Sequence, residues 1–155
     1  MELFPITKNL AVVTRPRGGD WLADELVRLR QSGIDALVSC LTPIEETELA
    51  LDDEREQAER AGLAFIRLPI EDRGLPPMAV ADQVAKAIAR RVEAGERVAV
   101  HCRQGLGRAP LVVGTVLVRS GVAPDEAWAA IERGRGQPVP DTPAQREWLR
   151  LFADL

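Results

Sequence analysis

Eight residues in the middle of the chain combine a cysteine, two glycines and an arginine at a spacing that suits phosphate chemistry. They run from His101 to Arg108 and read HCRQGLGR. A strand is expected before them and a helix after them, so the loop amides and the helix N-terminus would converge on one point of partial positive charge. Arg108 adds a planar fork that can hold two oxygens of a tetrahedral anion. We therefore expect an oxyanion site in this loop.

Cys102 stands at the start of this loop and is the candidate nucleophile. Gly105 and Gly107 can take the positive φ angles that turn successive N–H groups inward. The same donors would stabilise a cysteine thiolate, which is the attacking form of the side chain. A lone cysteine is more often a small buried apolar residue. Here the neighbouring His101, the glycines and Arg108 favour the catalytic interpretation.

The segments around the loop predict a single α/β domain over residues 1–155. Short runs rich in Val, Ile and Leu alternate with longer segments of helical period, which indicates a mainly parallel sheet of four to five strands flanked by helices. Strands are expected at residues 10–13, 34–41, 63–68 and 97–101. Helices are expected at residues 20–32, 45–60, 78–94 and 109–119, and from residues 124 and 143 onwards.

Three details of these helices follow from local signals. Asp20 is placed to cap the first helix. The apolar residues of 78–94 that recur every four positions should face the sheet, namely Val80, Val84, Ile88 and Val92. Residues 142–145, TPAQ, have the pattern of a capping box for the last helix.

Composition excludes several classes of protein. With 46% apolar and 28% charged residues the chain is typical of a globular protein, and no apolar run is long enough to span a membrane. Residues 1–5 lack the basic region and apolar run of a signal peptide, so a cytoplasmic protein is expected. Two cysteines and one histidine are too few for a disulfide scaffold or a zinc site. A net charge of −4 predicts no nucleic-acid partner and no membrane insertion, and we expect a monomer without a metal.

The pattern HCxxGxGR resembles the signature of the cysteine-dependent protein tyrosine and dual-specificity phosphatases. Residues 33–41 and 63–76 are similar to the strand and the acid-bearing loop that precede this signature, and the chain resembles in particular the cyclin-dependent-kinase-associated phosphatases. The resemblance implies a phosphocysteine intermediate, a parallel sheet with helices on both faces, and no cofactor or metal. It also implies a substrate that is a phosphorylated protein or a small phosphomonoester.

By that resemblance Asp72 would protonate the leaving oxygen and later take a proton from the attacking water. Expulsion of an alkoxide or phenoxide is assisted by a carboxylic acid, typically by about 10²–10⁴-fold. Glu71 is the nearest competitor for this role. The alternative is that Asp72 only forms a turn in the Pro- and Gly-rich segment 69–77.

Further residues complete the predicted site. The phosphate would be bound by the loop residues Arg103, Gln104, Gly105, Leu106, Gly107 and Arg108. His101 is expected to tune Cys102 through hydrogen bonds, although it is also compatible with a satisfied core histidine. Gln145 resembles a glutamine that positions water in some relatives, but a glutamine in a first helical turn is also an ordinary cap.

Two features depart from the family pattern or add to it. Most relatives have Ser or Thr after the signature arginine, where this chain has Ala109. Loss of one hydrogen bond to a charged group costs about 1.5–3 kcal/mol, so phosphocysteine breakdown should be roughly 10- to 100-fold slower. Cys40 lies on the predicted strand 34–41 near the same sheet edge; a disulfide with Cys102 under oxidation is the alternative, and plain burial is favoured.

The leading hypothesis is a protein phosphatase for phosphotyrosine and also for phosphoserine or phosphothreonine. The alternatives are a phosphatase of a lipid, inositol or nucleotide phosphate, a phosphate-binding pseudophosphatase, and a rhodanese-type sulfurtransferase. Extra basic residues would favour polyanionic substrates, and Arg103 is the single addition to Arg108 in the loop. Only a phosphatase needs Cys102, Arg108 and Asp72 together.

Overall fold

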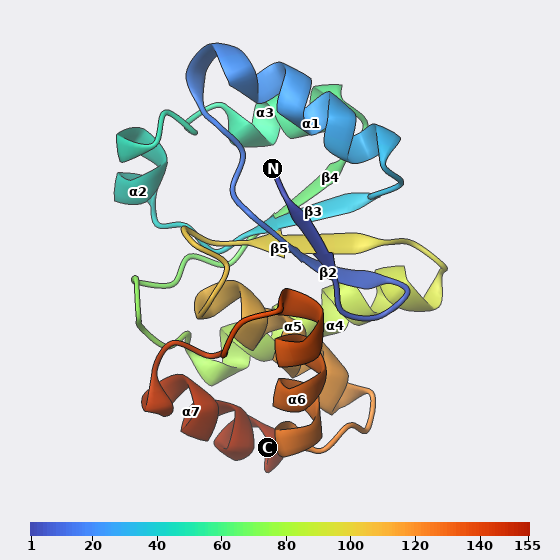
Figure 1. The fold of residues 1–155 in the computed structure, drawn as a ribbon, viewed down its shortest axis with the longest axis vertical. Coiled ribbons are helices and arrows are strands. Elements are labelled where there is room, and N and C mark those ends of the chain that lie inside the picture. The colour runs from blue at the N-terminus through green and yellow to red at the C-terminus, as the bar shows by residue number, and fades with distance from the viewer.

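A five-stranded sheet divides the computed structural model, which describes all 155 residues, into two helical layers (Figure 1). The strand order is β1–β2–β5–β3–β4. β1 is antiparallel to β2 and all other neighbouring strands are parallel. The strands are β1 (Leu3–Pro5), β2 (Leu10–Val13), β3 (Ala36–Ser39), β4 (Ala64–Arg67) and β5 (Val98–His101). The expected α/β fold is confirmed, with the short edge strand β1 as an addition to the predicted elements.

Helices cover both faces of the sheet. One face carries the 3-10 turn η1 (Gly19–Trp21), α1 (Leu22–Gln31) and α3 (Glu54–Arg60), while α2 (Pro43–Glu48) stands beyond the strand ends (Figure 1). The other face carries α4 (Met78–Glu93), α5 (Arg108–Arg119), α6 (Pro124–Arg135) and α7 (Pro143–Ala153). A core of 26 buried residues fills this second side and one of 13 the first. No helix is long and apolar enough to cross a bilayer.

The helix α5 lies at the centre of the larger layer. It packs against α4, α6 and α7, and its residues from Arg108 to Leu117 are all buried. Such burial explains why the segment is almost wholly apolar between Arg108 and Arg119, and it agrees with the buried central helix that the sequence predicts. The surrounding helices therefore fix the position of α5, and with it the helix N-terminus that follows the HCRQGLGR loop.

The single helix predicted at residues 45–60 is wrong, because the chain forms two helices there. Thr42 and Glu45 make a reciprocal capping box that starts α2, with Pro43 in its first turn. After α2 the chain turns through Ala50 at φ 55°, and Leu51 becomes fully buried in the smaller core. Burial of Leu51 therefore interrupts a segment whose charged residues alone predict one continuous helix.

Two local predictions also need correction. Asp20 lies in the 3-10 turn and caps nothing, since α1 begins after Trp21 without a side-chain cap. The buried positions of α4 are Ala81, Ala85 and Ile88, whereas Val80 is 44% exposed. Ile88 is buried as predicted, and Val84 and Val92 are partly buried against the same core, so only Val80 lies off the face that packs on the sheet and α5.

Candidate active site

The loop that joins β5 to α5 lies at the carboxyl ends of the parallel strands. Cys102 follows β5, is 3% exposed, and its Sγ accepts a hydrogen bond from the Gly105 amide at 3.3 Å. Gly105 has the expected positive φ, 77°. The same expectation for Gly107 is wrong, because its φ is −127°. Gly107 is needed for space instead, since a Cβ there would lie 2.2 Å from Oδ1 of Asp141.

Arg135 holds the loop from its outer side. Its Nε donates to the carbonyl of Gly105 at 3.0 Å and a terminal nitrogen donates to that of Gln104 at 3.3 Å, while the guanidinium stacks 4.0 Å from the ring of Phe4. Carbonyls that are bound from outside leave the amides free to face the pocket. The sequence indicates a structural role for Arg135 as a basic residue of the segment 133–136, but it does not place the side chain against this loop, because Arg135 lies far away on α6.

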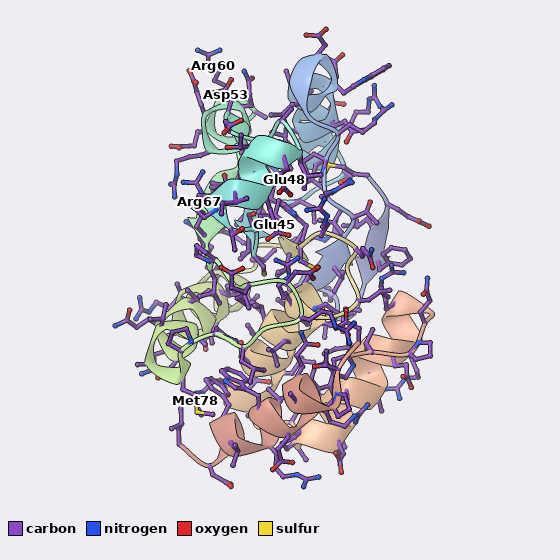
Figure 2. All side chains as sticks on the ribbon, turned by 90° about the vertical axis from the view of Figure 1, so that its left-hand side faces the viewer. Glu45, Glu48, Asp53, Arg60, Arg67 and Met78 are labelled. Atoms are coloured by element: carbon purple, nitrogen blue, oxygen red, sulfur yellow. The ribbon has the colours of Figure 1, made fainter.

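Arg108 is fixed by a carboxylate that the sequence did not single out. Its two terminal nitrogens donate to the two oxygens of Glu45 at 2.6 and 2.9 Å, and one also donates to the carbonyl of Ile70 at 2.8 Å. Figure 2 shows Glu45 and Glu48 on the side of α2 that faces the loop. The capping-box spacing from Thr42 could have placed Glu45 in the first turn of α2, but not opposite Arg108.

The electrostatics of this pair favour the charged forms of both groups. Burial alone would raise the pKa of Glu45, but the hydrogen bonds from Arg108 and Thr42 lower it to about 2. Burial would likewise lower the pKa of Arg108, and the hydrogen bond to Glu45 with the nearby anionic groups raises it instead. The guanidinium is thus a permanent cation beside Cys102.

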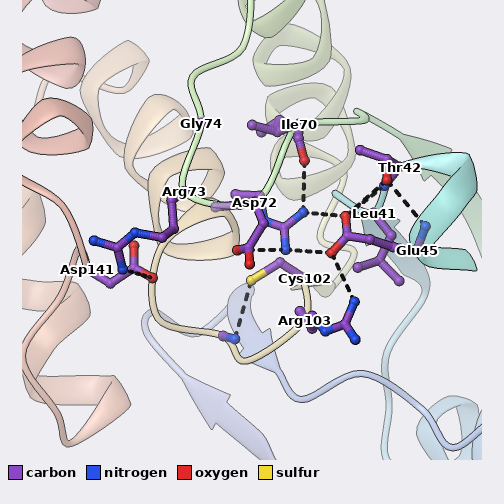
Figure 3. Close-up of polar contacts among 12 residues, drawn as sticks. Leu41, Thr42, Glu45, Ile70, Asp72, Arg73, Gly74, Cys102, Arg103 and Asp141 are labelled. Atoms are coloured by element: carbon purple, nitrogen blue, oxygen red, sulfur yellow. Dashed lines mark hydrogen bonds and ion pairs between the residues drawn. The ribbon is translucent and has the colours of Figure 1, made fainter. Parts of the chain in front are cut away.

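Asp72 lies on the segment 69–77, which is a loop as predicted. Its Oδ1 accepts from Arg108 at 3.2 Å while its side chain is 62% exposed (Figure 3). The competing Glu71 is exposed, and its backbone carbonyl accepts a hydrogen bond from the amide of Gly74 at 2.7 Å. Of the two carboxylates it is therefore Asp72 that faces the anion-binding arginine.

His101 and Glu54 form a fully buried pair behind the cysteine. Nε2 of His101 lies 2.5 Å from a carboxylate oxygen of Glu54, and Nδ1 lies 3.2 Å from the carbonyl of Cys102. Both partners can accept, so this geometry favours the ring form in which both nitrogens donate. Burial alone would lower the pKa of His101, but the charge and hydrogen bond of Glu54 raise it. Glu54 is a second residue that sequence reasoning missed, because it lies on α3.

Gln145 is buried against the loop at the start of α7. Its backbone amide is capped by Thr142, but the side chain does not return to complete a capping box; Nε2 reaches the carbonyl of Gly74 at 3.4 Å. The predicted box is thus half formed. The side-chain oxygen of Gln145 is buried without a hydrogen-bond partner, and the residue lies beside Gly107.

A small, shallow pocket opens above Cys102. Asp141, which sequence reasoning did not select, lines it on the side of Arg73, whose guanidinium is 4.0 Å from the Asp141 carboxylate (Figure 3). A Pro-flanked Asp before a helix, resembling the surroundings of Asp72, is the one sequence signal for it. The residues around the pocket are Asp72, Arg73, Cys102, Gln104, Leu106, Gly107, Arg108 and Asp141.

Arg103 and Cys40 complete the surroundings of the loop. The Arg103 side chain is neutralised by Glu48 at 3.2 Å and by Glu45 at 3.7 Å, so it adds little positive charge to the pocket. Cys40 is a free, fully buried thiol. Burial, followed by the charge of Cys102, raises the pKa of Cys40 well above its ordinary value.

Comparisons with known proteins find similar sequences and similar folds. A family model described as a polymorphic toxin system DSP-PTPase phosphatase matches residues 11–122. The probable protein tyrosine phosphatase type IVA A of Dictyostelium discoideum is 31% identical over 111 residues, which cover 70% of this chain and 62% of that protein. The chain thus spans less than two thirds of the length of that relative.

Solved structures give the same result for the fold. Tk-PTP in its active form superposes with a TM-score of 0.83 at 26% identity, over 98% of this chain and 96% of that one. A kinase associated phosphatase, studied with a substituted catalytic-site cysteine, also has a TM-score of 0.83, at 21% identity over 94% of this chain and 85% of that one. At 21% identity, the match to the kinase associated phosphatase shows that the fold is shared and nothing further.

Proposed function

The chain belongs to the dual-specificity and tyrosine phosphatase (DSP-PTPase) family, and on that premise we propose that it hydrolyses phosphotyrosine in proteins, and also phosphoserine or phosphothreonine. The observation that carries the proposal is the convergence of Cys102, Arg108 and Asp72 on one pocket. These groups supply a nucleophile, an anion fork and a proton donor, which are the parts that cleavage of a phosphomonoester requires.

In the first step the Cys102 thiolate attacks phosphorus and the bond to the leaving oxygen breaks. The electron pair goes to that oxygen, which takes a proton from the carboxyl of Asp72. In the second step water attacks phosphorus, the P–S bond breaks, and its electron pair returns to Cys102 as thiolate while the carboxylate takes the proton of the water. Arg108 and the loop amides bind the phosphoryl oxygens throughout.

The second step is expected to be slow. The hydrogen bond that reaches Sγ of Cys102 comes from the Gly105 amide at 3.3 Å, and Ala109 offers no hydroxyl to assist the departing thiolate. One missing hydrogen bond to a charged group corresponds to roughly 10- to 100-fold in rate. A burst of leaving group equal to the enzyme concentration, followed by slow turnover, is therefore expected.

Charge around the pocket supports a protein substrate over a polyanionic lipid, inositol or nucleotide phosphate. Besides Arg108, the basic side chains near the pocket are Arg103 and Arg73, and each faces a carboxylate. A polyphosphorylated ligand needs several unpaired cations. The names of the similar proteins, which are protein tyrosine phosphatases, also support the proposal.

Hydrolysis of a phosphotyrosine peptide, a phosphoserine peptide and a phosphoinositide by the wild type, Cys102→Ser and Asp72→Asn tests the proposal. We expect the wild type to hydrolyse the phosphotyrosine peptide, Cys102→Ser to be inactive, and Asp72→Asn to be slower by about 10²–10⁴-fold. Binding of phosphate without hydrolysis of any of the three would identify a pseudophosphatase instead. Preference for the phosphoinositide would overturn the assignment of a protein substrate.

We propose a cytoplasmic location for this activity. Both cysteines are free in the structure, and a catalytic thiolate persists where thiols are kept reduced. Labelling of Cys102 with a thiol reagent in cells, compared with Cys102→Ser, tests this location.

A further inference from the structure

Two carboxylates line the pocket over Cys102, and the proposed function uses only one of them. Asp72 and Asp141 come from separate loops, before α4 and before α7, and both border the pocket with Cys102 and Arg108. Asp72 accepts from Arg108, and Figure 3 shows Asp72 close to Cys102 and Asp141 farther away, beside Arg73. The side chain of Asp141 is 29% exposed, against 62% for Asp72, so it is the more enclosed of the two.

Asp72 is engaged by the arginine that has to bind phosphate. Its Oδ1 accepts a hydrogen bond from a terminal nitrogen of Arg108 at 3.2 Å. The two terminal nitrogens of Arg108 also donate to the carboxylate of Glu45 and to the carbonyl of Ile70. A carboxylate oxygen that accepts from a guanidinium is occupied by that hydrogen bond and points away from other partners. For as long as this ion pair persists, Asp72 is not free to serve the reacting oxygen.

Asp141 is placed beside the loop without such a partner. Its closest recorded cation is the exposed Arg73, at 4.0 Å, and Gly107 is the residue that lets its carboxylate approach, since a Cβ there would clash with it. Next to it, also against Gly107, lies the amide of Gln145, whose buried side-chain oxygen has no partner. The Asp141 carboxylate, 4.0 Å from its nearest cation, and the Gln145 amide group thus both lie against Gly107 at the edge of the pocket, where a carboxylate can carry a proton and an amide can hold a water.

We propose that Asp141 is a second catalytic acid–base residue that shares proton transfer with Asp72; this inference rests on the proposed phosphatase function. In the first step the P–O bond breaks and the leaving oxygen takes its proton from the Asp141 carboxyl. In the second step the Asp141 carboxylate takes a proton from the water, held by Gln145, as the water attacks phosphorus and the P–S bond returns its electron pair to Cys102. Asp72 performs the same transfers when it is released from Arg108.

Leaving-group dependence separates this role from a structural one. Phenyl phosphate, with a poor leaving group, needs an acid far more than 4-nitrophenyl phosphate does. We expect Asp141→Asn to lower kcat/KM for phenyl phosphate by at least about tenfold and to change it much less for 4-nitrophenyl phosphate. The double variant with Asp72→Asn should lose more than either single variant, and Asp141→Glu should restore part of the activity on phenyl phosphate.

The outcomes distinguish this proposal from the proposed function. Equal losses on both substrates, or none on phenyl phosphate, would overturn the role of Asp141 even though the wild type remains active. An inactive wild type, or activity that survives Cys102→Ser, would overturn the phosphatase function itself. Arg73→Gln serves as a control for the contact with Asp141 and should not reproduce the leaving-group effect. Circular dichroism and thermal unfolding of Asp141→Asn check that the fold is retained.

Discussion

The floor and the rim of the pocket are built in opposite ways. The floor comprises buried side chains that each have a charged or backbone partner: His101 with Glu54, Arg108 with Glu45, and Cys102 with the Gly105 amide. The rim comprises Asp72, Arg73 and Asp141, which are more exposed and belong to the loops 69–77 and 136–142.

This difference corresponds to two kinds of chemical work. Binding and attack need donors that are already in place, since an ordered site costs no reorganisation during the reaction. Proton transfer to substrates of different shape needs groups that can move. Buried ion pairs fix the floor, whereas exposed pairs at the rim contribute little stability and are easily rearranged.

The largest effect should come from the anion fork of the floor. Arg108→Lys replaces two directed donors with a point charge, and loss of about two charge-assisted hydrogen bonds corresponds to roughly 10²–10⁴-fold in kcat/KM. Arg103→Lys, in the same loop but half-buried against Glu48, should change kcat/KM only a few-fold. Similar losses in the two variants would erase the distinction between the directed fork and a general positive charge.

The buried pair of His101 and Glu54 should control stability at high pH. Glu54→Gln breaks it and should cost about 3–5 kcal/mol of unfolding free energy. Because the folded pKa of His101 is raised, this contribution is complete below about pH 6.5, the unfolded value, and is lost as pH rises through the folded pKa. Urea unfolding between pH 5 and 9 measures the difference in unfolding free energy between the wild type and Glu54→Gln. A difference that does not become smaller as pH rises would mean that His101 is neutral in the folded protein.

The pair of Glu45 and Arg108 should control stability at low pH. The folded pKa of Glu45 is about 2 against an ordinary 4.5, so its contribution of roughly 3 kcal/mol is complete above pH 4.5 and is lost as pH falls towards 2. Glu45→Gln should remove that part of the acid sensitivity. The exposed i,i+4 pair Glu56–Arg60 provides the control, since Glu56→Gln should change stability by less than about 0.5 kcal/mol. Equal acid unfolding curves for wild type and Glu45→Gln would contradict the prediction.

A smaller effect on turnover is expected at Ala109, where the floor of the pocket lacks a hydrogen-bond donor for the Cys102 thiolate. Ala109→Ser adds a hydroxyl after the arginine and should speed phosphocysteine breakdown by roughly 10- to 100-fold. Rapid-quench kinetics with 4-nitrophenyl phosphate would show a reduced burst and faster steady-state turnover. An unchanged steady-state rate would show that the second step is not limiting.

The smallest effect belongs to the rim. Arg73 is 64% exposed and only 4.0 Å from Asp141, so Arg73→Gln should alter stability by less than about 1 kcal/mol and kcat/KM by a few-fold. Thermal unfolding and steady-state kinetics check both. A loss of kcat/KM as large as that of Arg108→Lys would mean that Arg73 takes part in phosphate binding, as the floor residues do.

Local patterns were sufficient for most of the scaffold and for the centre of the site. The sequence predicts four of the strands, the buried helix α5 and the loop from His101 to Arg108. These features depend on neighbouring residues: the periodicity of apolar residues, the placement of glycines and the spacing of Cys102 and Arg108. Local signals were misleading at residues 45–60, where burial of Leu51 divides the helix, and at Gly107, where the constraint is contact with Asp141 and not backbone angle.

The sequence by itself thus determined which residues could attack and bind a phosphoryl group, since those residues lie within one short loop. Only the tertiary structure decided what supports them. Glu45, Glu54, Arg135 and Asp141 reach the loop from α2, α3, α6 and the segment before α7, across separations that no local pattern encodes. The physical reason is that a buried charge needs a partner wherever the fold places one, and strand order and helix packing choose that partner.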